Sequence, residues 1–214
     1  MSRRYDLVVL GGGTAGLVSS LIAAGGGARV ALIERERTGG DCLWTGCVPS
    51  KSLIAAAALA HRMRHADSVG LVPVDPRIDF ARVMAHVWGA IRTIEPHDSP
   101  ERLRAAGVEV IEATGAFTAP GRIDAGGRNL SWRTAIIATG SRPLLPPIDG
   151  LADADQLTTD TVWDPRDLPR GLVVFGGGAV GCELAQAFAR LGCKSRSSRW
   201  PTGCCPRRSG ERAR

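Results

Sequence analysis

Residues 5–16 of the chain read YDLVVLGGGTAG, and this stretch decides the fold. Residues 5–10 are an apolar run typical of a buried parallel strand, and glycines follow it at once. A helix rich in small residues is expected over 17–24, and a second apolar strand over 29–33 ends at Glu34. Strand, glycine turn, helix and strand together form a βαβ unit, which is typical of α/β proteins with a parallel sheet.

The glycine turn has the spacing G-x-G-x-x-G, with Gly11, Gly13 and Gly16 at the three fixed positions. The first glycine permits a tight turn, the second lets the backbone approach a pyrophosphate, and the third allows close helix–strand contact. The helix N-terminus presents free N–H groups and a partial positive charge to an anion. Glu34 ends the next strand, where a carboxylate can accept hydrogen bonds from ribose hydroxyls. The pattern predicts a dinucleotide site; the alternative is a glycine-rich turn that binds nothing.

Two cysteines, Cys42 and Cys47, lie in the segment GGDCLWTGCVPSK at residues 39–51. They could be half of a metal site, but no second cysteine pair or histidine cluster follows at ligand spacing, so no metal is expected. They could also be two unrelated buried thiols. The neighbouring glycines and a predicted helix from about Ser50 to His65 favour a reactive dithiol. A helix N-terminus stabilises a thiolate, and the short spacing lets a disulfide open and close.

The chain after the cysteine motif continues the α/β pattern as far as a proline-rich segment, 143–150, which predicts a domain boundary. Beyond it a strand over 172–175 leads into a second glycine turn, with Gly176, Gly178 and Gly181 at the same spacing. Two such turns, each after a strand, indicate a protein that binds two dinucleotides. Before the boundary we expect a helix over 79–95, a strand over 108–113, short antiparallel strands over 117–132 and a buried strand over 134–138.

The segment 39–51 resembles the redox-disulfide signature of the class I pyridine nucleotide-disulfide oxidoreductases, which include mercuric reductase, dihydrolipoamide dehydrogenase and glutathione reductase. Members of that family commonly have threonine where Asp41 stands. The resemblance implies a Rossmann-like FAD-binding domain over residues 1–150, with a parallel sheet and a small antiparallel insert. It also implies that residues 151–194 are the first βα unit of a second Rossmann-like domain, which binds NAD(P). FAD and NAD(P)H are therefore the implied cofactors.

The resemblance also implies roles for individual residues. Cys42 would be the thiol that attacks the substrate, and Cys47 would be the thiol that faces the flavin. Lys51 would lie beside the reactive edge of the flavin and pair with Glu183; the alternative is that both are solvated surface charges. Further FAD contacts are implied for Gly40, Thr139, Gly140 and Ser141, and Gly176, Gly178 and Gly181 would seat NAD(P)H.

The 214-residue chain has a formal charge of +6, which by itself would suggest an acidic partner such as nucleic acid. Residues 194–214 hold seven cations and one anion, which is +6, so residues 1–193 are neutral. Because these basic residues lie in a segment without apolar periodicity, we expect 195–214 to be disordered and expect no nucleic-acid binding. No apolar run is expected to reach the length of a membrane span, and the paired cysteines favour redox chemistry in the cytoplasm.

After Lys194 the family pattern stops. A family member would continue with a strand of the type Val-x-Val-Val-Glu, whereas residues 195–206 read SRSSRWPTGCCP. Plausible GC-rich codons for these residues, regrouped after one added base, encode VTVVEMADRLLP. We therefore hypothesise a frameshift after Lys194, which would make Cys204 and Cys205 out-of-frame leucines and the chain a truncated family member.

Two functions follow from the sequence. The first is an FAD-dependent enzyme that passes electrons from NAD(P)H through the flavin to the Cys42–Cys47 disulfide and on to a small disulfide or mercuric ion. The alternative is a non-catalytic flavoprotein fragment. Complete relatives are expected to be homodimers, whose C-terminal domain supplies an acid–base histidine to the partner subunit, and that domain is not expected within these 214 residues.

Overall fold

The computed structural model describes residues 4–198, a mixed α/β chain that divides into two compact units. Unit 1 consists of the residues up to Lys51 together with Ala85–Asp164. Unit 2 consists of Ser52–Met84 together with the residues from Pro165 onward. The sequence predicted a boundary at residue 150, whereas the compact units separate after Asp164, and unit 2 also takes in 52–84. The assignment of FAD and NAD(P) to residues 1–150 and 151–194 stays a prediction.

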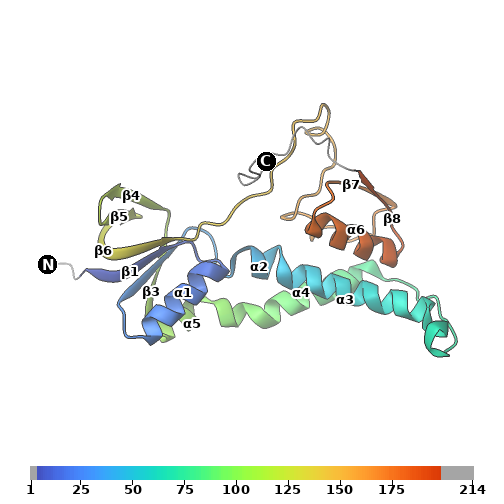
Figure 1. Ribbon diagram of the computed structural model, residues 1–214, viewed down its shortest axis with the longest axis horizontal. Helices are drawn as coiled ribbons and strands as arrows, with labels where there is room; N and C mark the ends of the chain where they lie inside the picture. The colour runs from blue at the N-terminus through green and yellow to red at the C-terminus, as the bar shows by residue number, and fades with distance from the viewer. Residues whose placement is uncertain (1–3, 199–214) are drawn as a thin grey trace, which may run out of the picture. The chain divides into compact units, whose positions relative to one another are not determined.

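A six-stranded sheet forms the centre of unit 1 (Figure 1). Its spatial order is β3–β2–β1–β6–β5–β4, and the first four strands pair in parallel while β4 and β5 are antiparallel. This is the predicted parallel sheet with a small antiparallel insert. The strands are β1 (Tyr5–Leu10), β2 (Val30–Glu34), β3 (Val108–Glu112), β4 (Gly115–Ala119), β5 (Arg122–Ala125) and β6 (Arg128–Ile137).

Strand β6 is one ten-residue strand where the sequence predicted two. Its first residues, up to Ser131, pair antiparallel with β5, and the residues from Trp132 onward pair in parallel with β1. Because the strand changes partner without a break, it joins the insert to the parallel sheet. It also brings Ala138 to the end of β1, where the Ala138 N–H donates to the Leu10 carbonyl at 2.8 Å.

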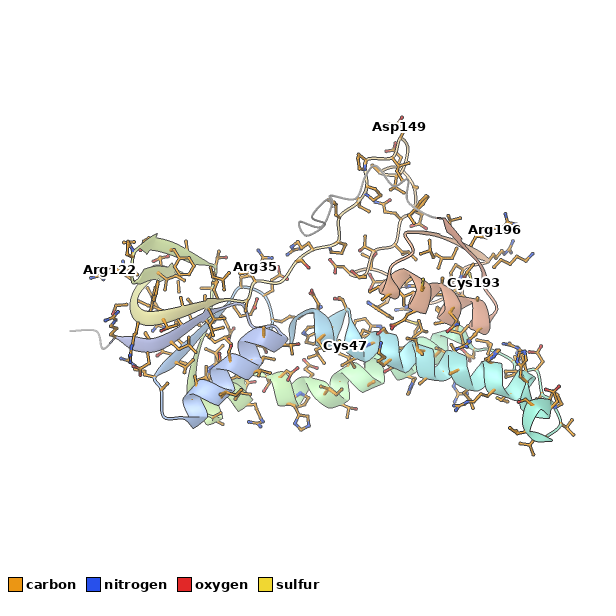
Figure 2. All side chains as sticks on the ribbon, viewed as in Figure 1. Arg35, Cys47, Arg122, Asp149, Cys193 and Arg196 are labelled. Carbon is orange, nitrogen blue, oxygen red and sulfur yellow. The ribbon has the colours of Figure 1, made fainter. Side chains whose placement is uncertain are left out.

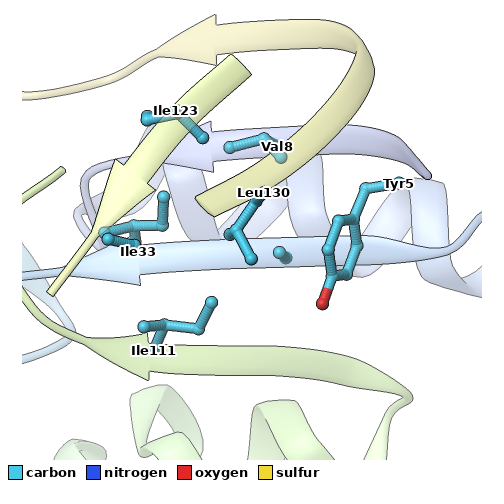
Figure 3. Close-up of a cluster of buried hydrophobic side chains, with 8 residues drawn as sticks. Tyr5, Val8, Ile33, Ile111, Ile123 and Leu130 are labelled. Atoms are coloured by element: carbon cyan, nitrogen blue, oxygen red, sulfur yellow. The ribbon is translucent and has the colours of Figure 1, made fainter. Parts of the chain in front are cut away.

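Both faces of the sheet are buried along β1 and β2, which explains the apolar runs of these two strands. The sequence predicted a buried strand over 134–138, but this part of β6 is half-buried to exposed, with Ile137 69% exposed. Alternate residues along each strand point to opposite faces. One set packs with helices α1 (Thr14–Gly25) and α5 (Pro100–Ala105) through Leu17 and Leu103. The other set packs under the β5–β6 hairpin (Figure 3). The first cluster contains Leu7, Val9, Val30, Leu32, Val108 and Val110, and the second contains Tyr5, Val8, Ala31, Ile33, Ile111, Ile123, Ala125 and Leu130.

Two longer helices and a short one follow the first βαβ unit. These are α2 (Gly40–Trp44), α3 (Cys47–Arg64) and α4 (Phe80–Ile94), with 3₁₀ turns at Ala66–Val69 and Glu95–Asp98. The helical stretch Gly40–Arg64 is long and apolar enough to cross a membrane, with a mean hydropathy of 1.3, contrary to the expectation from sequence. Core helices of globular proteins meet the same criterion, so the stretch is no indication of a span by itself.

Unit 2 contains a second strand–turn–helix, formed by β7 (Gly171–Phe175) and α6 (Ala179–Leu191), followed by β8 (Lys194–Ser198). β7 and β8 pair in parallel from Gly171↔Lys194 to Phe175↔Ser198. The sequence predicted a disordered tail from residue 195, but residues 195–198 form this strand. They do so although they are polar, because the chain returns from α6 beside β7 and the backbone can pair. Residues 199–214, including Cys204 and Cys205, lie outside the described residues.

Candidate functional site

The first glycine turn has the backbone geometry that only glycine accommodates at two of its three fixed positions. Gly11 has φ +108°, and a Cβ added to it would lie 2.2 Å from the carbonyl oxygen of Ala138. A Cβ on Gly16 would lie 1.9 Å from the carbonyl oxygen of Gly11. A Cβ on Gly13 would meet nothing closer than the Cα of Gly40, at 3.7 Å. The turn is therefore closed against the protein at Gly11 and Gly16 and open to a ligand at Gly13.

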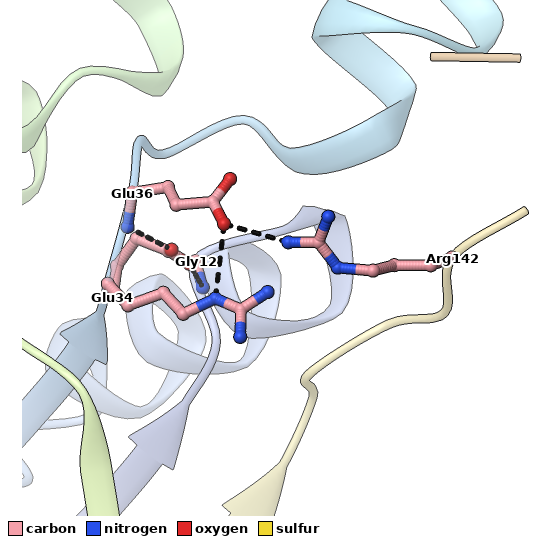
Figure 4. A network of polar contacts seen from close by, with 5 residues as sticks. Gly12, Glu34, Glu36 and Arg142 are labelled. Atoms are coloured by element: carbon pink, nitrogen blue, oxygen red, sulfur yellow. Dashed lines mark hydrogen bonds and ion pairs between the residues drawn. The ribbon is translucent and has the colours of Figure 1, made fainter.

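The Glu34 carboxylate is tied to this turn (Figure 4). One of its oxygens accepts a hydrogen bond from the N–H of Gly12 at 2.6 Å, and the other accepts from the N–H of Glu36 at 2.8 Å. These bonds fix the carboxylate at the end of β2, beside the turn, where the sequence predicted a ribose-binding acid. The same bonds hold the glycine turn against the next strand.

An ion-pair group that sequence reasoning missed lies next to Glu34. The Glu36 carboxylate forms ion pairs with two arginines (Figure 4). Its Oε1 atom lies 3.2 Å from Nε of Arg35 and 2.9 Å from Nη2 of Arg142. The Arg37 guanidinium lies over the Trp44 ring, 3.8 Å from its centre. The sequence contained one signal for these residues, because the run Glu34–Arg37 alternates in charge directly after a parallel strand, where ligands of such sheets bind. Arg142 is distant in sequence and had no such signal.

These segments surround a cavity of about 810 Å³, within the usual size of a small-molecule site. The walls come from the glycine turn, the end of β2, α2, the end of β3 and the chain that leaves β6. Of the predicted site residues, Gly11, Gly13, Glu34, Gly40, Cys42, Thr139, Gly140 and Ser141 line it. Gly16, Cys47 and Lys51 are not among its lining residues. Residues that sequence reasoning missed, Arg35, Glu36, Arg37, Trp44, Arg142 and Asp160, also line it.

The glycines of the cysteine motif explain how the two cysteines come together. Gly39 and Gly40 have φ +101° and +56°, which lets α2 begin immediately and carry Cys42. The Thr45 N–H donates to the Asp41 carbonyl at 3.0 Å and ends this single turn of helix. A Cβ on Gly46 would lie 2.8 Å from the same carbonyl, so a larger residue there would open the loop. The chain then starts α3 at Cys47, three residues before the predicted helix start (Figure 2).

Cys42 and Cys47 are both free thiols in the structure, Cys42 half-buried and Cys47 exposed. The hydrogen bond between their side chains raises the pKa of the Cys47 thiol above its usual value, and burial raises it further. The positive charge of Lys51 acts in the opposite direction. The sequence predicted a thiolate stabilised by the helix N-terminus. In this dithiol the neighbouring thiol outweighs that effect, since a thiol that donates a hydrogen bond holds its proton more tightly.

The second glycine turn repeats the geometry of the first. Gly176 has φ +116°, close to the +108° of Gly11, and Gly178 precedes α6 with φ −74°, close to the −76° of Gly13 before α1. A Cβ on Gly181 would lie 2.9 Å from the carbonyl oxygen of Gly176. This distance is longer than the 1.9 Å at Gly16, but the pattern is the same. A Cβ on Gly178, the middle glycine before the N-terminus of α6, would meet no atom of residues 4–198 within 4 Å.

Lys51 and Glu183 belong to different compact units. Lys51 lies in the first turn of α3 and Glu183 in the first half of α6. Their pairing beside the flavin stays a prediction. Cys182, next to Glu183, is exposed, and its thiol donates a hydrogen bond to the Gly177 carbonyl oxygen with an Sγ–O distance of 3.7 Å.

Two strand–glycine turn–helix units, one of them beside a pair of neighbouring thiols, define the class of an α/β dinucleotide-binding redox protein. Comparison with known proteins gives the family. The chain belongs to the pyridine nucleotide-disulphide oxidoreductases, whose family pattern matches residues 5–197. Members of this family are FAD-dependent and use NAD(P)H.

Individual relatives agree. The chain is 34% identical to a mercuric reductase of Streptomyces lividans over 196 residues, which cover 89% of this chain and 41% of that protein. It is 30% identical to a dihydrolipoyl dehydrogenase of Acholeplasma laidlawii over 199 residues, or 91% of this chain and 59% of that protein. Among solved structures, the HOCl-induced flavoprotein disulfide reductase RclA from Escherichia coli superposes with a TM-score of 0.75 at 26% identity, over 90% of this chain and 41% of that one. The chain thus spans about two fifths to three fifths of the length of these relatives.

The residues of the first cavity fit FAD. Gly13 leaves space at the N-terminus of α1, where backbone N–H groups favour a pyrophosphate, and Glu34 stands at the end of the neighbouring strand. Thr139–Ser141 and Cys42 line the same cavity. Gly11 and Gly16 keep the turn tight against the protein backbone, and Gly13 leaves the open side on which a dinucleotide can approach closely.

Proposed function

We propose that this chain carries the electron-transfer centre of an FAD-dependent disulfide oxidoreductase. In this proposal Cys42 and Cys47 receive two electrons from NAD(P)H by way of the flavin and pass them to a small disulfide or to mercuric ion. The observation that carries the proposal is that Cys42 lines the dinucleotide cavity and lies close enough to Cys47 to raise the pKa of that thiol. Cavity and dithiol are thereby joined through one residue, Cys42.

Residues of the chain would hold both cofactors. Gly11, Gly13 and the N-terminus of α1 would bind the FAD pyrophosphate, Glu34 a ribose, and Thr139–Ser141 the part nearer the flavin. The turn Gly176–Gly181 would bind NAD(P)H. When bound, FAD supplies the two-electron chemistry that no amino-acid side chain provides. The remaining steps belong to the cysteines.

With a disulfide substrate the exchange balances in two steps. The Cys42 thiolate attacks one substrate sulfur, so that a Cys42–substrate bond forms, the substrate disulfide breaks and the released thiolate takes a proton. The Cys47 thiolate then attacks the Cys42 sulfur, forming the Cys42–Cys47 disulfide and releasing the second substrate thiol. The protein gives up two electrons and two protons and the substrate gains both. Lys51 would favour the Cys47 thiolate in the second step, because its charge lowers the pKa of that thiol.

Mercuric ion would be bound by the same pair, since soft thiolates are its preferred ligands. The mercuric reductases among the relatives support this substrate, and the dihydrolipoyl dehydrogenases support a disulfide. We also propose a cytoplasmic setting, where the free thiols of the described residues would persist. Because the chain spans only part of its relatives, full turnover in a homodimer would draw on regions that those relatives have beyond the matched part.

The test is NADH and NADPH oxidation by the FAD-loaded protein with lipoamide, glutathione disulfide and mercuric ion as acceptors. We expect the FAD-loaded protein to reduce one acceptor at least once per flavin at the expense of NADH or NADPH, a reaction lost in Cys42→Ser and in Cys47→Ser and kept in Cys182→Ser. The second candidate, a flavoprotein fragment without catalysis, is favoured by the 41% coverage of several relatives. It predicts bound FAD and a reducible dithiol but no acceptor-dependent oxidation. Failure to bind FAD at all would contradict both.

A further inference from the structure

The charges that line the dinucleotide cavity are unexpected for a site that holds a pyrophosphate. Four carboxylates and three guanidinium groups line it. Two of the guanidinium groups, those of Arg35 and Arg142, are already paired with Glu36. The third, Arg37, lies over the Trp44 ring. The cations at the cavity are thus engaged with other side chains, and an anionic ligand would meet a lining whose formal charge is negative.

Of the carboxylates that line the cavity, Asp41 is the one we expect to affect the binding of a pyrophosphate most strongly. It follows Gly40, whose backbone packs on Gly13 at the start of α1, since a Cβ on Gly40 would lie 2.6 Å from the Gly13 Cα. An oxygen of the Asp41 carboxylate lies 4.0 Å from the position of a Cβ on Gly140. The carboxylate therefore lies in the cavity beside Gly140, on a residue that directly follows the glycine packed against the start of α1.

The Asp41 carboxylate is exposed to the cavity and is not neutralised by a partner. Within residues 4–198 no ion pair includes it. By comparison, the Glu34 carboxylate is engaged by the N–H groups of Gly12 and Glu36. A helix N-terminus attracts phosphate through its free N–H groups and partial positive charge, and a nearby carboxylate opposes that attraction.

We propose that Asp41 sets the affinity of the cavity for its dinucleotide by placing an uncompensated negative charge beside the pyrophosphate. The inference rests on the proposed binding of FAD in this cavity. It identifies Asp41 as a residue that determines affinity without taking part in the exchange of electrons. A neutral residue of the same size at this position would bind the dinucleotide more tightly, and the difference would concern phosphate-bearing ligands alone.

The experiment compares the full chain with Asp41→Asn, which keeps the shape and removes the charge. Dissociation constants for FAD, ADP and riboflavin are measured by titration at low ionic strength. We expect Asp41→Asn to bind FAD and ADP about tenfold more tightly, a change between the limits for charges in water and in protein interior. Riboflavin, which has no phosphate, should bind both proteins equally. At about 0.5 M salt the tenfold ratio should shrink, because mobile ions screen the repulsion.

Two further variants make the comparison specific. Asp153→Asn removes one charge from the same unit at a residue that does not line the cavity, so it should leave all three affinities unchanged. Asp41→Ser should reproduce the gain if charge is the cause and replace Asp41→Asn if that variant fails to fold. Equal or weaker FAD binding by the neutral variants would overturn the inference while leaving the proposed function intact, and so would an equal gain for riboflavin. Absence of FAD binding in every protein would overturn both.

Discussion

The first glycine turn has two roles, the packing of α1 against β1 and the binding of a ligand. Replacement of Gly16 by alanine should disturb the packing, whereas replacement of Gly13 should disturb the binding. The Cβ of Gly16→Ala would lie 1.9 Å from the Gly11 carbonyl oxygen, whereas ordinary contact begins at 3.4 Å. The backbone must therefore move by about 1.5 Å, the difference between these distances. The Cβ is fixed to the backbone of Gly16 in α1, and the carbonyl oxygen belongs to Gly11, which directly follows β1. Neither residue can therefore move without moving the element beside it.

The expected magnitude follows from two opposing effects. Forcing extra volume into a packed region costs about 3 kcal/mol at the upper end of the usual range. Alanine recovers about 1 kcal/mol relative to glycine inside a helix. We therefore expect Gly16→Ala to lower the free energy of unfolding by about 2 kcal/mol.

Two other glycines provide matched controls. A Cβ on Gly13 meets nothing closer than 3.7 Å, so Gly13→Ala should fold with unchanged stability but bind FAD about tenfold more weakly, because its methyl group faces the cavity. A Cβ on Gly181 would lie 2.9 Å from the Gly176 carbonyl oxygen, so the backbone there must also shift, but by about 0.5 Å where Gly16→Ala needs about 1.5 Å; Gly181→Ala should therefore be less destabilising than Gly16→Ala.

Urea unfolding followed by circular dichroism measures stability, and FAD fluorescence quenching measures affinity. The reasoning predicts that Gly16→Ala loses stability while Gly13→Ala loses affinity. Wild-type stability in Gly16→Ala, or equal destabilisation by both variants, would refute the geometry assigned to the turn.

Three further predictions concern other parts of the chain. The hydrogen bonds to Glu109 lower the pKa of its carboxyl, so Glu109→Gln should cost about 1 kcal/mol at pH 7; this difference should shrink as the pH falls below the ordinary pKa of a glutamate and vanish below the lowered pKa of the folded protein, and urea midpoints against pH measure it. The buried Ser195 hydroxyl has no hydrogen-bond partner within residues 4–198, so Ser195→Val should raise the urea midpoint by the equivalent of about 1 kcal/mol, and a lowered midpoint would contradict that assignment. Because the contact with Cys42 raises the pKa of Cys47, Cys42→Ala should lower that pKa, shifting the alkylation of Cys47 by iodoacetamide to lower pH.

Much of the fold was predictable because β1 and β2 are buried on both faces. The apolar runs of β1 and β2 have no other explanation in a chain of this composition, and the glycine spacing between them requires a strand–turn–helix. The geometry found at Gly11 and Gly16 agrees with this reading, since a Cβ at either position would strike backbone.

The elements that were missed depend on pairing between distant segments. β6 continues through the point where two strands were expected, because β1 takes over as its partner after β5. β8 forms from polar residues because β7 offers backbone groups in register. Neither pairing leaves a periodic pattern in the sequence.

The site shows the same division between local and distant contacts. Glu34 was predictable because it ends a strand next to the turn that it binds. The ion pair of Glu36 with Arg142 joins residues 106 positions apart, and only the fold brings them together. The contact between Cys42 and Cys47 was predictable from spacing, but the raised pKa of Cys47 was not, because it depends on how closely the two thiols lie and on their burial.

The most direct measurement of the central claim is the visible spectrum of the FAD-loaded protein during reduction by one equivalent of a dithiol, which supplies the two electrons that open one disulfide. The account predicts a long-wavelength charge-transfer band when the Cys42–Cys47 disulfide opens, lost in Cys47→Ser and unchanged in Cys182→Ser, a cysteine of unit 2. A spectrum that bleaches directly to reduced flavin, or a band that survives Cys47→Ser, would contradict the assignment of Cys42 and Cys47 as the electron-transfer pair.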